Sequence, residues 1–231
     1  MNKIRKILFK ATSQCNLACK YCFESNRGSH DGFQDYPALF TFLKTLDLCD
    51  DIYIHPFGGE PTLYPNRIYQ IIRTFNRLER HRSVRTHFGF TTNGTNMDLV
   101  EDLLQNDMLR DDVVFSYDGI YSSSRTRHSK SETFTDVYFN NVIRRIGESN
   151  ILSKHVSVSI ALTPLNIDDY IRTINFLMES NIHLWEYYFV SDFIKVYNTS
   201  EFCDKFQEII QYICNNTTEK NRTINKNLIN F

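Results

Sequence analysis

Apolar residues along the chain alternate between two spacings, one typical of strands and one typical of helices. Apolar segments of strand length occupy residues 4–11, 51–57, 86–92, 113–117, 155–162 and 183–190. Segments with helical spacing of their apolar residues occupy residues 36–48, 65–80, 98–107, 133–148, 167–180 and 200–214. Asn166, just ahead of two aspartates, is expected to cap the helix over 167–180.

This succession of strands and helices predicts an α/β fold with a parallel sheet, because right-handed strand–helix–strand crossovers join parallel neighbours. The loops that follow the strands should then gather at one edge of the sheet, where such folds bind ligands. After residue 215 the chain is rich in Asn and Thr and loses apolar periodicity. We therefore expect residues 1–215 to form the core domain and residues 216–231 a polar C-terminal tail.

Composition narrows the class of protein. The 231 residues are 42% hydrophobic and include 18 Phe and 13 Tyr, enough for a sizeable core. The net charge of −1 gives no overall attraction to nucleic acid or membrane. Apolar runs are shorter than a membrane span needs, and no secretory leader pattern opens the chain. We expect a cytoplasmic protein without membrane association.

Half of the cysteines lie on one short loop directly after the strand over 4–11. The spacing is C-x3-C-x2-C, formed by Cys15, Cys19 and Cys22. Three thiolates so close together are typical of a metal loop rather than of disulfides. They could ligate three irons of a [4Fe-4S] cluster and leave the fourth iron open, whereas ordinary ferredoxins use four cysteines. A zinc site with His30 as fourth ligand is the alternative.

The other cysteines lie far from this loop, at Cys49, Cys203 and Cys214. The last two are eleven residues apart on one expected helix and therefore share a face. We expect all three to be buried as small apolar residues, which leaves one cluster in the chain.

Three further polar motifs each follow an expected strand. Gly58-Gly59-Glu60-Pro61 follows the strand over 51–57, Thr91-Thr92-Asn93-Gly94 closes the next one, and Ser116-Tyr117-Asp118-Gly119 closes the one after that. Read alone, the first two are also compatible with ordinary Gly-Gly and Asn-Gly turns. Their common position after strands predicts one site built from several loops.

With Tyr21 at its aromatic position, the cysteine loop reads C-x3-C-x-aromatic-C. Together with the downstream Gly-Gly-Glu-Pro motif, this resembles the radical SAM superfamily. The resemblance implies a partial (β/α)6 barrel, open on one side, and an oxygen-sensitive [4Fe-4S] cluster held by the three cysteines. It implies reductive cleavage of S-adenosylmethionine (SAM) to a 5′-deoxyadenosyl radical that abstracts hydrogen from a substrate. The electron would come from a reducing partner such as flavodoxin or ferredoxin.

The resemblance also implies roles for residues around SAM. The Gly-Gly-Glu motif would contact the SAM amino group, Ser116 the methionine or ribose, and Arg127 the carboxylate. Leu162 would flank adenine. The cofactor-binding set is Tyr21, Gly58, Gly59, Glu60, Asn93, Ser116, Arg127 and Leu162. For Arg127 a basic surface loop is the alternative, and Asp118 could instead support its own loop through backbone bonds.

The Ser-x-Asp-Gly element is similar to that of sulfatase-maturase-like and peptide-modifying members of the family. The chain departs from them because it lacks both their His-Asp-x-x-Arg motif and a cysteine-rich C-terminal extension. A core with little material for a lid favours a peptide or protein substrate that shields the radical itself. Tyr187, Tyr188 and Lys195 could face that substrate.

Other functions stay open. Six arginines between residues 67 and 85, and a second basic loop at 125–130, are compatible with a nucleoside or nucleic-acid substrate. A glycyl-radical-enzyme activase would also be a compact protein of this family. A non-enzymatic zinc-binding module is the alternative from a different class.

Overall fold

The computed structural model describes residues 3–22, 24, 34–182, 185–190 and 199–216. The chain forms two compact units. The first comprises residues 1–16 and 23–114, and the second comprises residues 17–22 and 115–231. The boundary therefore falls inside the cysteine loop, with Cys15 in the first unit and Cys19 and Cys22 in the second.

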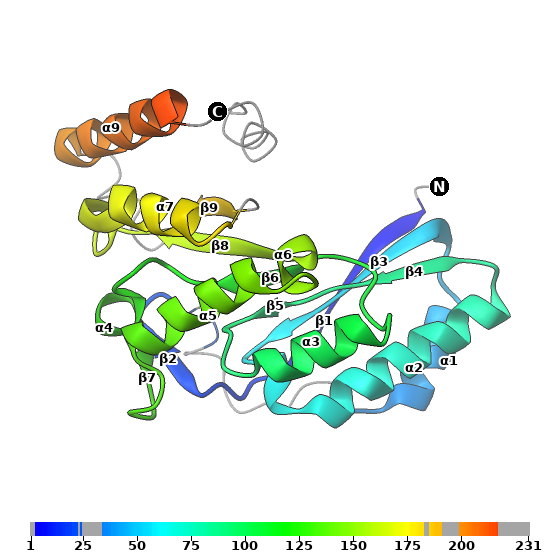
Figure 1. Ribbon diagram of the computed structural model, residues 1–231. Coiled ribbons are helices and arrows are strands. Elements are labelled where there is room, and N and C mark those ends of the chain that lie inside the picture. The colour runs from blue at the N-terminus through cyan, green and yellow to red at the C-terminus, as the bar shows by residue number, and fades with distance from the viewer. Residues whose placement is uncertain (1–2, 23, 25–33, 183–184, 191–198, 217–231) are drawn as a thin grey trace. The chain divides into compact units, whose positions relative to one another are not determined.

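The first unit is built on a parallel three-stranded sheet in the order β1–β3–β4. These strands are β1 (Ile4–Thr12), β3 (Leu48–Gly58) and β4 (Arg85–Phe88). Three helices lie on one side of it (Figure 1): α1 (Tyr36–Leu43), α2 (Pro65–His81) and α3 (Met97–Gln105). Two short elements, η1 (Pro61–Leu63) and β5 (Thr91–Thr92), carry the loops that follow β3 and β4.

Helix α2 shows why the sequence folds this way. Pro65 occupies the first turn, where its missing N–H costs no helical hydrogen bond. Its apolar side chains recur at helical spacing on one buried face: Ile68, Ile71, Ile72, Phe75 and Leu78. Phe75 stacks on Phe9 of β1 with ring centroids 6.3 Å apart. Each such buried side chain contributes about 1.5–3 kcal/mol, and this fixes the helix on the sheet.

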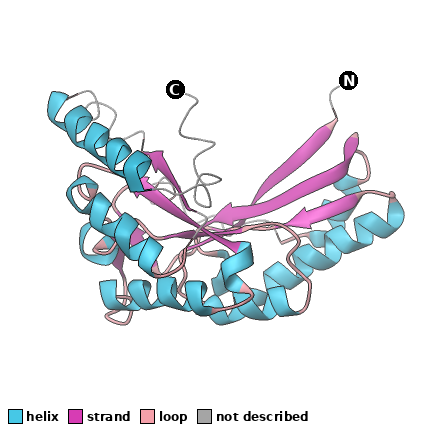
Figure 2. Ribbon diagram, turned by 45° about the horizontal axis from the view of Figure 1, so that its top comes forward, coloured by secondary structure: helices cyan, strands magenta, loops and turns pink. Residues whose placement is uncertain are grey.

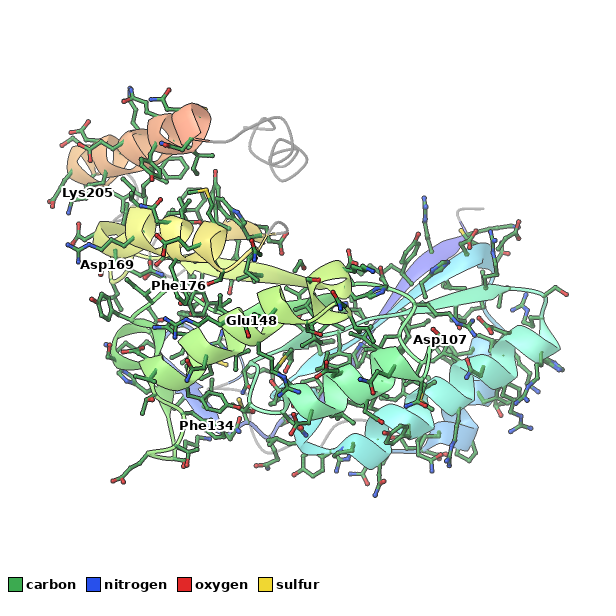
Figure 3. All side chains as sticks on the ribbon, in the orientation of Figure 1. Asp107, Phe134, Glu148, Asp169, Phe176 and Lys205 are labelled. Carbon is green, nitrogen blue, oxygen red and sulfur yellow. The ribbon has the colours of Figure 1, made fainter. Side chains whose placement is uncertain are left out.

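The second unit contains the end of β6 (Val113–Ser116) and the parallel pair β8 (Val156–Leu162) and β9 (Trp185–Phe189). Its longer helices, seen with the other elements in Figure 2, are α5 (Asp136–Glu148), α7 (Tyr170–Glu179) and α9 (Ser200–Asn216). Its short helices are α4 (Ser122–Arg125), α6 (Leu152–His155) and η2 (Ile167–Asp169). Lys205, labelled on α9 in Figure 3, pairs with Asp168 of η2 at 2.7 Å.

A small antiparallel pair in the second unit was not expected from the sequence. It joins β2 (Leu17–Cys19), inside the cysteine loop, to β7 (Arg127–Ser129). Cys19 lies opposite Arg127 in this register. The N–H of Lys20 extends the pairing by donating to the carbonyl of Thr126 at 2.9 Å. The second half of the cysteine loop is thereby attached to the loop after β6.

The α/β fold class with parallel strand pairs is confirmed, whereas several expected boundaries are wrong. The helix over 36–48 ends at Leu43, since Leu48 already begins β3. The strand over 86–92 is interrupted at Gly89, where the backbone comes so close to Asp112 that a Cβ would lie 2.4 Å from its carbonyl oxygen. The helix over 167–180 opens with the 3-10 turn η2. His183 lies outside the described residues.

Asn166 does not cap the helix as expected. Its side-chain oxygen accepts from the N–H of Thr163 at 2.8 Å, and its amide donates to the carbonyl of Asp118 at 2.9 Å. Asn166 therefore braces the ends of β8 and β6 instead. This is a tertiary role, which the local pattern could not indicate.

The expectation that Cys203 and Cys214 are buried is wrong. Both are exposed and Cys49 is half-buried, because the buried face of α9 consists of Phe202, Ile209 and Ile213. No disulfide joins any of the six cysteines, all of which lie in the described part of the chain. Among the described residues, no helix is both long enough and apolar enough to cross a bilayer.

Candidate functional site

The Gly-Gly-Glu loop lies directly on the backbone that leads into Cys15. The N–H of Gly59 donates to the carbonyl of Thr12 at 2.8 Å, and that of Glu60 donates to the carbonyl of Gln14 at 2.7 Å. A Cβ on Gly58 would lie 2.0 Å from the oxygen of Thr12, and one on Gly59 would lie 2.0 Å from that of Gln14. Side chains are thus excluded at both glycines by backbone contact.

Glu60 connects this loop to the Thr-Thr-Asn-Gly loop. Its carboxylate is buried, with 1% of the residue exposed. One oxygen accepts from the N–H and hydroxyl of Thr62, at 3.0 and 2.6 Å, and from the hydroxyl of Thr92 at 2.9 Å. The other accepts from the N–H of Asn93 at 2.6 Å. These bonds make Glu60 a support that fixes the two loops, while its direct contact with SAM stays a prediction.

Asn93 links the Thr-Thr-Asn-Gly loop to the cysteine loop. Its side-chain nitrogen lies 3.6 Å from the sulfur of Cys15 and 2.9 Å from the side-chain oxygen of Asn16. The structure thus brings together five of the predicted residues at the carboxyl ends of β1, β3 and β5: Cys15, Gly58, Gly59, Glu60 and Asn93.

A second polar cluster, in the second unit, is centred on Asp118. Asp118 has a left-handed backbone conformation, with φ of 66°, and is 1% exposed. Its carboxylate accepts from the N–H of Ala161 at 3.0 Å, from the hydroxyl of Thr126 at 3.3 Å and from the hydroxyl of Tyr21. Asp118 was expected to support its own loop through backbone bonds, but its backbone bond goes to β8, and its bond within the loop is to the Thr126 side chain. The motif aromatic residue, Tyr21, is bound to the same carboxylate.

Arg127 is buried in this cluster, so the basic surface loop expected as its alternative is wrong. It is 3% exposed, and its Nε has no hydrogen-bond partner within the described residues. Burial acts to lower the pKa of Arg127, but the charge of Asp118 and the nearby Tyr21 raise it above its ordinary value. Burial raises the pKa of Asp118, and Arg127 opposes this rise. The guanidinium therefore keeps its charge and has a donor available for an anionic ligand.

The remaining predicted residues differ in how far they are buried. Ser116 ends β6 and is half-buried, and Leu162 ends β8 and is fully buried. Tyr188 is 42% exposed on β9, and burial raises the pKa of Tyr187 to about 12. Two candidates from the sequence, His30 and Lys195, lie outside the described residues.

Sequence reasoning missed three residues that hold the predicted ones in place: Asn16, Thr95 and Thr126. Asn16 could have been found from its position beside Cys15, since an amide next to a metal ligand is a common orienting group. Thr126 had no local signal, because it comes to the cysteine loop only through the pairing of β2 with β7, the strand that follows it.

The residues present fit an iron–sulfur cluster and SAM. Thiol groups suit iron–sulfur chemistry better than hard cations such as magnesium. The Gly-Gly backbone leaves no room for a side chain, and Arg127 keeps an unused donor. Within the described residues, no three His, Cys, Asp or Glu side chains already converge as a metal site. The convergence of Cys15, Cys19 and Cys22 on one cluster thus stays a prediction.

The sequence model that describes the radical SAM superfamily matches residues 9–177, which is most of the chain. The chain therefore belongs to the radical SAM superfamily, and the resemblance noted in the sequence is confirmed. Members of this superfamily are enzymes that use a [4Fe-4S] cluster and SAM, in agreement with the predicted cofactors.

Two curated relatives illustrate the range of the family. An S-adenosylmethionine-dependent nucleotide dehydratase of Flammeovirga pacifica is 26% identical over 200 residues, covering 80% of this chain and 62% of the relative. A tungsten-containing aldehyde ferredoxin oxidoreductase cofactor-modifying protein of Pyrococcus furiosus is 28% identical over 122 residues, covering 52% of this chain and 30% of the relative. The chain thus spans less than two thirds of either relative.

Solved structures show the same fold. The enzyme anSMEcpe with bound AdoMet and Kp18Cys peptide matches with a TM-score of 0.65 and 19% identity, over 80% of this chain and 51% of that one. SuiB of Streptococcus suis bound to its precursor peptide SuiA matches with a TM-score of 0.62 and 16% identity, over 92% and 47%. This likeness is consistent with the predicted partial barrel.

Replacing Glu60 with Gln should lower the free energy of unfolding of the metal-free protein by about 1–3 kcal/mol at pH 7, because an NH2 group would face a buried donor. Burial raises the pKa of Glu60, although bonds from Thr62, Asn93 and Thr92 oppose this. The folded state therefore holds the Glu60 proton more tightly than the unfolded state. The stability that Glu60 contributes is lost as pH rises from its ordinary pKa through the raised one.

The stability difference between wild type and Glu60→Gln should accordingly be larger at pH 5 than at pH 8 in urea unfolding. Titration of all other groups cancels in this comparison. A difference that grows with pH would mean that the pKa of Glu60 is lowered on folding, contrary to this account.

Proposed function

We propose that this chain is a radical SAM enzyme that modifies a peptide or protein. Cys15, Cys19 and Cys22 would ligate the cluster, which leaves one iron open for the amino and carboxylate groups of SAM. The observation that carries the proposal is the buried Glu60 carboxylate, which joins the Gly-Gly-Glu and Thr-Thr-Asn-Gly loops beside Cys15. An isolated Gly-Gly turn does not need a carboxylate that joins it to the loop after the next strand.

The residues of the chain have separable tasks in this proposal. Gly58 and Gly59 would let SAM approach the backbone, and carbonyl groups of the loop would accept from its ammonium group. Arg127 would meet the SAM carboxylate through its unused Nε, while Asp118 keeps the guanidinium charged. When bound, the cluster and SAM supply an electron and the 5′-deoxyadenosyl radical that abstracts hydrogen from the substrate.

Two observations support a peptide or protein substrate. The solved structures with the same fold include anSMEcpe with a peptide and SuiB with its precursor peptide. In this chain, Tyr188 exposes 42% of its surface on β9, in the same unit as Tyr21, where a substrate chain could contact it. A reducing partner such as flavodoxin or ferredoxin, and a cytoplasmic location, belong to the same proposal.

A nucleotide substrate is the second candidate, favoured by the match of the nucleotide dehydratase over 80% of this chain. The arginines between residues 67 and 85 support it less than the sequence suggested. Arg77 lies over the ring of Phe40 at 4.0 Å, Arg82 donates to the carbonyl of Leu46 at 2.5 Å and Arg85 pairs with Asp51 at 2.9 Å. Each of these three guanidinium groups already has a partner within the protein.

Transfer of deuterium from a labelled substrate to 5′-deoxyadenosine distinguishes these candidates. The reconstituted protein is incubated with SAM, dithionite and either deuterated candidate peptides encoded beside its gene or deuterated nucleotides. Deuterium in 5′-deoxyadenosine with a peptide supports the proposal, whereas deuterium only with nucleotides supports the second candidate. Transfer from a glycyl loop of a large partner enzyme would identify an activase. Bound zinc without sulfide would contradict the proposal.

A further inference from the structure

We infer that Asn93 is a positioning residue that donates a hydrogen bond to the sulfur of Cys15 and thereby raises the reduction potential of the cluster. The inference rests on the proposed function, because it takes Cys15 as a cluster ligand. The side-chain nitrogen of Asn93 lies 3.6 Å from that sulfur, a normal length for a bond to sulfur, and both residues belong to the first unit.

The orientation of the Asn93 amide follows from its neighbours. Its oxygen lies 3.0 Å from the backbone nitrogen of Thr95 and 2.7 Å from the Thr95 hydroxyl. A backbone N–H can only donate, so an oxygen has to stand opposite it. The NH2 group of Asn93 must therefore be the end that faces Cys15. A flipped amide would place two donors against each other at Thr95 and an oxygen against the sulfur.

The rest of the network holds the amide in this orientation. The Asn93 nitrogen also donates to the side-chain oxygen of Asn16 at 2.9 Å, and the Asn16 nitrogen donates to the Thr95 hydroxyl at 2.9 Å. These bonds close a ring of three side chains. The backbone of Asn93 is fixed separately by its bond to Glu60 at 2.6 Å. The donor is thus held toward Cys15 by bonds to both its side chain and its backbone.

The hydrogen bond from Asn93 to the Cys15 sulfur should raise the reduction potential of the cluster, because it stabilises added negative charge. Reduction adds an electron to the cluster, and part of that negative charge resides on the ligand sulfurs. An N–H group directed at a sulfur stabilises the reduced form more than the oxidised form, and such bonds are among the groups that set cluster potentials. Asn93 is 6% exposed, so little water screens the interaction. The bond should make the cluster easier to reduce.

The test is an EPR-monitored redox titration of the reconstituted holoprotein, without SAM, for wild type, Asn93→Leu and Asn93→Asp. Asn93→Leu removes the donor, and Asn93→Asp places a carboxylate oxygen in its position. The midpoint potential should fall in the order wild type, Leu, Asp. We expect at least a tenfold lower ratio of reduced to oxidised cluster in Asn93→Asp at a fixed potential, which is about 59 mV for one electron.

Asn96→Ala is the matched control. Asn96 caps α3 and donates to the carbonyl of Thr62, so its loss also destabilises this unit, but it has no bond to Cys15. Its midpoint should equal that of wild type. If neither Asn93 variant holds a cluster, Thr95→Val replaces them, since it leaves Asn93 and all three cysteines intact. The variant loses the hydroxyl bond to the Asn93 oxygen and the acceptor of the Asn16 amide but keeps the Thr95 N–H, so the potential should fall by less than in Asn93→Leu.

The outcomes separate this inference from the proposed function. A wild-type protein that binds no [4Fe-4S] cluster contradicts the proposed function. A wild-type protein that binds the cluster and cleaves SAM, while the Asn93 and Thr95 variants share its midpoint potential, overturns the role of Asn93 alone.

Discussion

Replacing Asp118 with Asn should lower the free energy of unfolding of the second unit by about 3–5 kcal/mol, because the charge of Arg127 is then left buried without compensation. Both side chains are almost fully inaccessible, at 1% and 3% exposure. Asn tolerates the left-handed backbone at this position, with φ of 66°. Its oxygen can still accept from the N–H of Ala161. The substitution therefore removes the charge and preserves most of the geometry.

The measurement is urea unfolding of the metal-free protein, followed by far-UV circular dichroism. Asp204→Asn, the same chemical change at an exposed position of α9, should stay within about 0.5 kcal/mol of wild type. The double variant Asp118→Asn with Arg127→Met should be more stable than the sum of the single losses predicts, since it removes both buried charges. Wild-type stability in Asp118→Asn would contradict the electrostatic role of Asp118.

Replacing Gly59 with Ala should abolish most of the cluster loading as well as destabilise the first unit. The new Cβ would lie 2.0 Å from the oxygen and 2.9 Å from the nitrogen of Gln14. Both contacts are to backbone, so rotation of a side chain cannot relieve them. The segment before Cys15 has to move, at a cost of about 1–3 kcal/mol or more. The displaced sulfur should then no longer match the other ligands.

Iron and sulfide content after anaerobic reconstitution measures this effect. Gly147→Ala is the matched control, because Gly147 lies in α5, outside the cysteine loop, and its Cβ would meet the carbonyl oxygen of Ser180 at 1.6 Å. The control should lose stability but load iron at the wild-type level. Full loading and normal SAM cleavage by Gly59→Ala would show that the close approach at residue 59 has no part in the site.

The cysteine motif and the Gly-Gly-Glu loop were predictable because the residues that give each of them its chemistry are neighbours in the sequence. The succession of strand-like and helix-like apolar segments was enough to predict the α/β fold. Helical spacing of the apolar residues was enough to predict helices such as α2. The pairing of β2 with β7 was not predictable, since three-residue strands have no periodicity of their own. The burial of Arg127 follows from that pairing and was missed with it. A charged residue in a serine-rich segment looks exposed until its partner Asp118 is located.

The roles of Glu60 and Asn93 were predictable only in part. Their position after strands indicated a common site, but the direction of a side-chain oxygen or nitrogen depends on neighbours distant in sequence. For Asn93 the decisive neighbours are Thr95 and Cys15, and for Glu60 they include Thr92. The exposure of Cys203 was missed because a small residue beside the buried Phe202 gives no signal of its own.

The most direct test of the central claim is formation of 5′-deoxyadenosine from SAM by the anaerobically reconstituted protein with dithionite, compared with its Cys19→Ala variant. The account predicts that wild type forms it and that the variant, which lacks one of the three cluster ligands, forms none above the protein-free control. A wild-type protein that carries iron and sulfide but forms no deoxyadenosine, or a variant that forms as much as wild type, would contradict it.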